Sequence, residues 1–296
     1  MTQGISLEQL NSGTRAEFVA ALGDIFEHSP WVPEVAAARR PFATLAELYE
    51  SLKAALLKAG ADRQLAVITA HPDLAGKAAR AGTLTPESTA EQASAGLDRL
   101  SETEYATFHR LNEAYKARFG FPFIICVRRH TKDSILRELD KRRASDAATE
   151  RGTALAEILR IVALRLDQRV RAPDRLAVHG RLSTHVLDNY SGRPGLGIAL
   201  ELLERSHSGE PRLITRGVTN DDGRTDAPLI AGRPIPIGAY ELRFAIGDYY
   251  ARAKAARADP PFLDVVPIRF AVAEPEGHYH VPLLCTPWSY TTYRGS

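Results

Sequence analysis

The sequence predicts two domains, an all-α helical bundle followed by a β-sandwich that contains one short helix. Two observations predict this architecture. Up to about residue 170, apolar residues recur at helical spacing behind helix-capping signals. After a short, charged stretch that contains a proline, apolar and polar residues alternate as they do in strands. We therefore expect an all-α domain at residues 1–170, a linker at 171–178 and the sandwich at 179–296.

The helices of the first half begin at recognisable caps. Thr14, Thr44 and Ser101 each precede a glutamate by three residues, the spacing of a capping box. Apolar stripes follow these caps, and the last long helix is predicted from about residue 153 to residue 168. Residues 121–127 alone read as extended. They could form a core strand or offer backbone amides to a ligand.

Composition and charge exclude several classes of protein. The 296 residues carry 38 basic and 36 acidic side chains, a net charge of +2, with no long basic run, so no nucleic-acid partner is expected. Neither a signal-like start nor an apolar run of about 20 residues occurs, so we expect no membrane partner and a cytoplasmic protein. Cys126 and Cys285 lie far apart in apolar runs, which favours buried free thiols over a disulfide.

Polar residues interrupt the helical pattern of the first half, and each has an ordinary interpretation as well as a functional one. His71 precedes Pro72 just past a predicted helix end, where it could face a cavity or cap the helix. Glu91 and Gln92 lie near the start of a helix, where acidic residues suit the macrodipole. Arg165 lies on or beside an apolar stripe, so it either extends to solvent or pairs with a buried anion.

Taken together, these residues resemble the 2-oxo-4-hydroxy-4-carboxy-5-ureidoimidazoline (OHCU) decarboxylase family. The motifs that match are HPDLA at 71–75, STAEQ at 88–92, FGFPFII at 119–125 and LRL at 164–166. The resemblance implies that His71 is the acid/base residue and that Glu91 and Arg165 complete the catalytic set by holding the substrate. It also implies that further residues contact the substrate: Pro72, Ser88, Gln92, Phe123, Ile125 and Val127.

The implied decarboxylation requires no cofactor. The carboxylate that leaves is attached to an imidazolone ring carbon, and the C=N system of the ring can take up the electrons. The protein has to position the carboxylate, exclude water and deliver a proton to one face, which one imidazole can do.

The second half has the alternation of a β-sandwich. Residues 240–246 and 266–272 alternate apolar and polar side chains, and one short helix is predicted at about residues 248–257. His185 on a strand would usually be structural, and Arg224 after a glycine turn would usually be solvated. His278 and His280 lie two apart and face the same side of a strand. They could bind zinc with a third ligand, but no carboxylate ligand is evident and no metal is expected.

This half resembles 5-hydroxyisourate hydrolase, an enzyme of the transthyretin-like family. The motifs that match are LSTHVLD at 182–188, TNDDGR at 219–224, HYHVPL at 278–283 and YRGS at 293–296. The resemblance implies catalytic roles for His185, Arg224 and His280, but none for His278. It places three residues near the C-terminus in the same site: Tyr293 and Ser296 as catalytic residues and Arg294 as a substrate-binding residue. It also implies a homo-oligomer, a tetramer with its sites at subunit interfaces.

The two resemblances predict one bifunctional enzyme of urate degradation. The C-terminal half would hydrolyse 5-hydroxyisourate, and the N-terminal half would decarboxylate the product, OHCU, to (S)-allantoin. Its partners would then be these small-molecule substrates. Two alternatives are a non-enzymatic carrier of the transthyretin type and a zinc-dependent cyclic-amide hydrolase.

Overall fold

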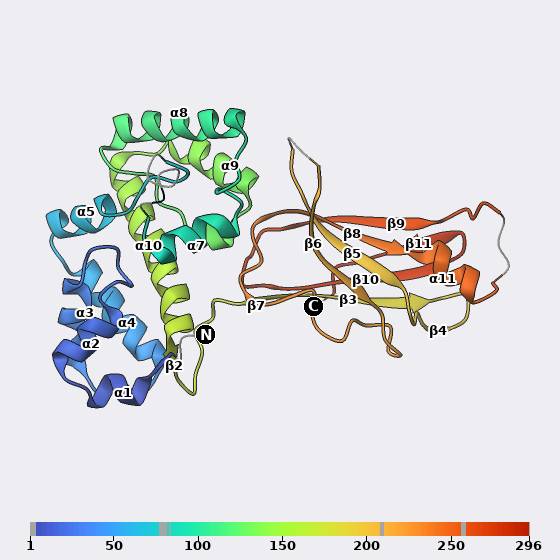
Figure 1. Ribbon diagram of the computed structural model, residues 1–296, viewed down its shortest axis with the longest axis horizontal. Helices are drawn as coiled ribbons and strands as arrows, with labels where there is room; N and C mark the ends of the chain where they lie inside the picture. The colour runs from blue at the N-terminus through green and yellow to red at the C-terminus, as the bar shows by residue number, and fades with distance from the viewer. Residues whose placement is uncertain (1–3, 77–81, 83, 208–209, 256–258, 296) are drawn as a thin grey trace. The chain divides into compact units, whose positions relative to one another are not determined.

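The structure is a computed structural model that describes residues 4–76, 82, 84–207, 210–255 and 259–295 (Figure 1). Contacts within the chain define two units. The first comprises the residues up to Arg128 together with Ile135–Val178, and the second comprises Arg129–Ser134 together with the residues from His179 on. The bounds 1–170, 171–178 and 179–296 stay a prediction. No helix in the described ranges is long and apolar enough to cross a membrane.

The first unit is built mainly of helices, and the long helix α10 runs through it (Figure 1). It contacts α4 and α5, and its buried stripe belongs to one apolar core together with the other helices. The α-helices of the described residues up to Arg169 are α1 Leu7–Ser12, α2 Arg15–Leu22, α3 Trp31–Ala36, α4 Leu45–Leu57, α5 Ala61–Thr69, α7 Pro86–Ser94, α8 Glu102–Phe119, α9 Lys132–Arg142 and α10 Ala147–Arg169.

The prediction of an all-α bundle is wrong. Strand β1, Ile5–Ser6, pairs in parallel with strand β2, Val170–Arg171, so the first unit contains a small sheet and the chain is mixed α and β. Each strand has two residues, which is too short for the alternation that reveals a strand in a sequence. The paired residues are also far apart in the sequence, so no local pattern joins them.

The caps explain where the helices begin. Thr14 and Ser101 form complete capping boxes, whereas the carboxylate of Glu47 accepts from the Ala43 amide instead of closing the box at Thr44. Helix α10 begins six residues before the predicted start, because Asp146 accepts from the amides of Ala148 and Thr149, at 3.0 and 2.9 Å. Its first turn is mostly polar and lacks the apolar stripe on which the prediction relied.

Residues 121–127, which the sequence predicts to be extended, are buried but form no strand, and side chains hold their backbone. Arg142 Nη1 donates to the Ile124 carbonyl at 2.8 Å, and the Cys126 amide donates to Glu157 Oε2 at 2.8 Å. The segment ends at a 3₁₀ turn, η2, Val127–Arg129. A backbone stretch that lacks a strand partner has to meet its hydrogen-bonding needs through such side chains.

The second unit contains two sheets that enclose a separate core (Figure 1). One sheet has the order β11-β10-β3-β4, with β7 also paired to β3, and the other has the order β6-β5-β8-β9. β10 runs parallel to β3, and the remaining pairs are antiparallel. The strands are β3 Gly180–Asp188, β4 Arg193–Pro194, β5 Ala199–Arg205, β6 Arg212–Val218, β7 Ile230–Arg233, β8 Gly238–Ala245, β9 Val265–Val272, β10 His278–Thr286 and β11 Ser289–Thr291.

The alternation in this half places its side chains as the period of two requires. Tyr240, Leu242 and Phe244 of β8 point into the core. The short helix α11 spans Ile246–Arg252, slightly earlier than predicted. The end predicted for it at residue 257 lies outside the described residues.

Candidate active sites

All nine residues that the sequence assigns to the first site line one cavity of the first unit, together with Leu74, Ile124 and Ile161. Three segments supply them besides α10. His71 and Pro72 follow α5. Ser88, Glu91 and Gln92 share one face of α7, because residues three and four apart are neighbours on a helix. Phe123, Ile125 and Val127 come from the 121–127 segment, and Arg165 comes from α10.

His71 is held in one tautomer by the backbone. Its Nδ1 lies 2.9 Å from the Val67 carbonyl oxygen, which can only accept, so Nδ1 carries a proton and donates. Nε2 of the neutral ring is therefore free to accept a proton. Burial lowers the pKa of His71, while the bond to Val67 and the charge of Glu27 oppose this shift.

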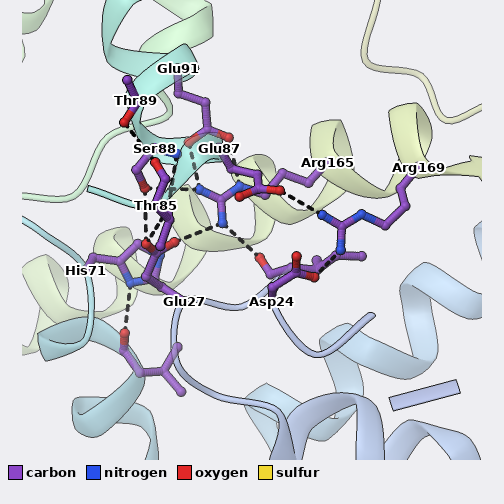
Figure 2. Close-up of polar contacts among 12 residues, drawn as sticks. Asp24, Glu27, His71, Thr85, Glu87, Ser88, Thr89, Glu91, Arg165 and Arg169 are labelled. Atoms are coloured by element: carbon purple, nitrogen blue, oxygen red, sulfur yellow. Dashed lines mark hydrogen bonds and ion pairs between the residues drawn. The ribbon is translucent and has the colours of Figure 1, made fainter. Parts of the chain in front are cut away.

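Arg165 lies at the centre of a buried ion-pair cluster (Figure 2). Its Nε and Nη2 donate to the two carboxylate oxygens of Glu91, both at 2.8 Å, and its Nη1 donates to Glu27 Oε2 at 3.0 Å. Burial lowers the pKa of Arg165, but Glu91 and Glu27 outweigh this effect, so the pKa is raised overall. Arg165 is therefore a permanent cation that pairs with two carboxylates.

Glu27 is the residue that sequence reasoning missed. Its side chain is 3% exposed and accepts from Thr85 at 2.9 Å and from Ser88 at 3.2 Å, besides Arg165. Burial raises the pKa of Glu27, but Arg165 and Thr85 lower it by more, so the pKa is lowered overall and the carboxylate stays ionised. The only local signal is weak, an acidic residue directly after the two apolar residues Ile25 and Phe26.

Hydrogen bonds and an ion pair hold the described part of the loop between α5 and α7 in place. Asn112 Nδ2 donates to the Leu74 carbonyl at 2.7 Å, and the Ala75 amide donates to Gln92 Oε1 at 2.9 Å. Lys116 pairs with Asp73 at 2.9 Å. These contacts place Pro72 and Leu74 against the cavity and orient the Gln92 amide.

The second site lies on the outer face of the sheet that contains β3 and β10. His280 is opposite Ser183 in the parallel register, and Ser183 Oγ lies 3.0 Å from His280 Nδ1 and 3.4 Å from His278 Nε2. Because side chains two apart share a face, His185 projects on the same side as Ser183. The backbone of His185 also forms an isolated antiparallel β-bridge with Arg224. Sequence reasoning missed Ser183, whose signal was its spacing of two from His185.

The two histidines of this site are biased toward the neutral form. Burial lowers the pKa of His185 and of His280, and the positive charge of Arg224 lowers both further. The side-chain nitrogen Nε2 of His185 is buried without a hydrogen-bond partner among the described residues. Neutral imidazoles beside a fixed cation can accept protons near neutral pH.

A glycine in the loop before Arg224 and one near the C-terminus allow close approach of the backbone. Gly223 has φ +72°, and a Cβ there would lie 2.3 Å from the Val186 carbonyl oxygen. Gly295 bridges to His280, and a Cβ there would lie 2.7 Å from Cδ2 of the His280 ring. Glycine at position 295 therefore allows the backbone to contact the His280 ring directly.

The residues near the C-terminus are only partly brought to this site. Tyr293 is exposed, and the Arg294 guanidinium lies 4.7 Å from the centre of the Tyr279 ring. Ser296 lies outside the described residues. Over the described ranges, no group of three or more His, Cys, Asp or Glu residues could hold a metal ion.

Comparison with known proteins adds two families. The OHCU decarboxylase family matches residues 11–167, and the HIUase/Transthyretin family matches residues 182–295. A 2-oxo-4-hydroxy-4-carboxy-5-ureidoimidazoline decarboxylase of Haloferax volcanii is 44% identical over 165 residues, 56% of this chain and 96% of that protein. A 5-hydroxyisourate hydrolase of Deinococcus radiodurans is 53% identical over 119 residues, 40% of this chain and 98% of that protein.

One solved structure resembles the whole chain. It is a crystal structure of (S)-allantoin synthase, 34% identical, with a TM-score of 0.52, and the match covers 99% of this chain and all of that one (100%). Both family matches therefore lie within one chain-long resemblance. The chain belongs to the OHCU decarboxylase family through its N-terminal half and to the HIUase/transthyretin family through its C-terminal half.

Proposed function

We propose that the chain is a bifunctional enzyme of urate degradation. Its C-terminal unit hydrolyses 5-hydroxyisourate to OHCU, and its N-terminal unit decarboxylates OHCU to (S)-allantoin. The observation that carries this is the pairing of two families in one chain that is similar to (S)-allantoin synthase over its length. Each half also has a cluster of histidine and arginine side chains that suits its reaction.

In the decarboxylase site, His71 is the acid/base residue. Its Nδ1 is committed to the Val67 carbonyl, so Nε2 is the atom that takes up and returns the proton. The bond between the ring carbon and the carboxylate breaks, its electron pair enters the C=N system of the ring, and Nε2–H then protonates the carbon. Glu91 and Arg165 set the charge of the site, and the remaining lining residues hold the substrate with water excluded: Pro72, Ser88, Gln92, Phe123, Ile125 and Val127.

In the hydrolase site, His185 and His280 are the candidate bases. One neutral imidazole removes a proton from water while the water attacks the ring carbonyl. The ring C–N bond then breaks, and the imidazolium returns that proton to the leaving nitrogen. Arg224 stabilises the negative charge that develops on the carbonyl oxygen. We also propose Tyr293 as a catalytic residue and Arg294 as a substrate contact of this site; the catalytic role predicted for Ser296 concerns a residue outside the described ranges.

Circular dichroism during turnover of freshly generated 5-hydroxyisourate tests both assignments. The wild type yields optically active allantoin. His280→Ala preserves 5-hydroxyisourate, and His71→Ala lets OHCU accumulate until racemic allantoin forms. His278→Ala and His109→Ala are matched controls, because His278 shares a strand with His280, and His109 stacks on Tyr105 of α8. If the wild type binds the compound but leaves its decay unchanged, the chain is a carrier and the proposal fails.

We also propose a homo-oligomer, a tetramer formed through the transthyretin-like unit. Large apolar side chains on and beside β11, an edge strand, support this assignment: Trp288, Tyr290 and Tyr293 are all exposed. Light scattering after size exclusion checks it, and Trp288→Glu lowers the mass if β11 forms the interface. The cytoplasmic location stays a prediction from the sequence.

A further inference from the structure

The Arg165 guanidinium has a partner for each of its three nitrogens. Besides Glu91 and Glu27, Nη1 donates to the Ile25 carbonyl at 3.3 Å, and Nη2 lies 3.5 Å from Ser88 Oγ. A guanidinium offers five N–H donors, and these contacts use all five. Arg165 would therefore have to give up an existing partner before it could grip a substrate carboxylate.

The cluster of Glu27, Arg165 and Glu91 carries a net negative charge. One guanidinium neutralises only one of two carboxylates, and the three side chains are 3%, 4% and 14% exposed. Burying an excess charge is costly unless another group offsets it. A titratable group that can become a cation and faces this charge is His71.

Glu27 is the member of the cluster beside His71. Figure 2 shows its carboxylate between the His71 ring and the Arg165 guanidinium. The charged and titratable groups that act on His71 are Glu27, Arg165 and His28; Glu27 favours the imidazolium and the other two oppose it. Thr85 and Ser88 donate hydroxyl protons to Glu27 Oε1, so the carboxylate is oriented by α7 and stays charged.

We propose that Glu27 is a positioning residue of the decarboxylase site. Its carboxylate holds Arg165 against α7 and stabilises the protonated form of His71. This inference rests on the proposed function. When Nε2 of His71 holds the proton destined for the ring carbon, the imidazolium and the cluster together are neutral. After the proton is delivered, the cluster is negative again, and the next proton is taken up at Nε2.

Removing the charge of Glu27 shifts the titration of His71. The imidazolium loses its nearest anion while burial and Arg165 still oppose it, so the pKa of His71 falls further below its ordinary value of 6.5. Loss of an opposite charge at such close range moves a titration by about one pH unit or more. Because His71 acts in its protonated form, the alkaline limb of kcat/KM for decarboxylation therefore moves to lower pH in Glu27→Gln, while Glu27→Asp stays near the wild type.

The test is an NMR pH titration of the full chain, in which the histidines are labelled with carbon-13 at Cε1. The resonance that disappears in His71→Ala is assigned to His71. Glu27→Gln lowers the His71 midpoint, and the alkaline limb for decarboxylation follows it. Glu87→Gln is the matched control, because Glu87 lies on the same helix but pairs with Arg169, at 3.1 Å. Its His71 midpoint stays within about 0.3 units of the wild type, well below the shift expected for a close charge.

A His71 midpoint that is unchanged in folded Glu27→Gln overturns the inference. Folding is judged from the fluorescence of Trp31, which packs against the core of the first unit. If Glu27→Gln does not fold, Glu27→Asp against Glu27→Asn gives the same comparison in a shorter side chain. If the midpoint shifts but the wild type decarboxylates nothing, the proposed function fails while the assignment of Glu27 to His71 stands.

Discussion

Replacing Glu150 with glutamine tests whether the cavity wall of the first unit depends on a buried ion pair. Glu150 Oε1 accepts from Arg142 Nε at 2.9 Å and from Nη2 at 2.6 Å, and from the Tyr115 hydroxyl. The two charged side chains are 0% and 7% exposed. Arg142 in turn donates to the Ile124 carbonyl and lies 4.5 Å from the centre of the Phe123 ring, so it holds the 121–127 segment that lines the cavity.

The cost of the substitution follows from burial. Glutamine keeps the size of the side chain but removes the charge that compensates Arg142, and breaking a buried pair by removing one partner costs about 3–5 kcal/mol. We expect about 3 kcal/mol, because the amide oxygen of glutamine can still accept one of the three bonds. With a urea m-value of about 2 kcal/mol/M, the midpoint falls by about 1.5 M.

The two tryptophans make the measurement specific to the unit. Trp31 lies in the first unit and Trp288 in the second, so a Trp288→Phe background reports on the first unit alone. Glu138→Gln is the control, because its pair with Lys141 is exposed at 3.9 Å and contributes under about 1 kcal/mol. If Glu150→Gln loses no more stability than Glu138→Gln, the carboxylate does not hold Arg142 and the reasoning is wrong.

Three further predictions concern the second unit. Burial raises the pKa of Glu241, but Arg243, Arg269 and Arg205 outweigh it and hold the pKa at about 2, below the usual 4.5. The stability that this carboxylate contributes is present above pH 4.5 and is lost as the pH falls toward 2, by about 1–2 kcal/mol after allowance for the partly exposed arginines. Urea titrations at several pH values should show that Glu241→Gln loses less stability over this range than the wild type. Gly295→Ala pushes a methyl group against the His280 ring and should lower kcat of the hydrolase at least about tenfold, with the decarboxylation rate unchanged. The two steps are measured separately, and an equal loss of rate in both would contradict this. Arg224→Gln removes a cation that lowers the pKa of both histidines, so the acid limb of hydrolysis should move to higher pH, and a limb that stays in place would show that Arg224 acts only on the substrate.

Local spacing in the sequence explains how part of the lining of the first site is arranged. Ser88, Glu91 and Gln92 share a helix face by their spacing alone, and His71 lies just past a helix end by its proline. Glu27 could not be placed in this way, since its partner Arg165 lies 138 residues away and no periodicity connects a loop to a helix. The pairing of β1 with β2 escaped notice for the same reason.

Residues 121–127 show a different limit. Their composition indicates a buried segment outside the helices, but composition does not reveal what the backbone pairs with. The structure satisfies it with Arg142 and Glu157, two charged residues of neighbouring helices that a helical stripe would assign to the surface. In the second unit, alternation places His278 and His280 on one face, but only the register of β3 with β10 shows that Ser183 lies opposite His280.

The histidines of both sites have lowered pKa values, but a neighbouring charge acts on them in opposite directions: Glu27 raises the pKa of His71, whereas Arg224 lowers the pKa of His185 and His280. Burial lowers the pKa of His71, His185 and His280 alike, so the neighbouring charge makes the difference. His71 faces the carboxylate of Glu27, which returns part of the lost basicity and suits a residue that has to hold a proton for carbon. His185 and His280 face Arg224, which keeps them neutral and suits residues that have to accept a proton from water. One chain can therefore run proton delivery and water activation at the same pH, because each site sets the protonation of its own imidazoles.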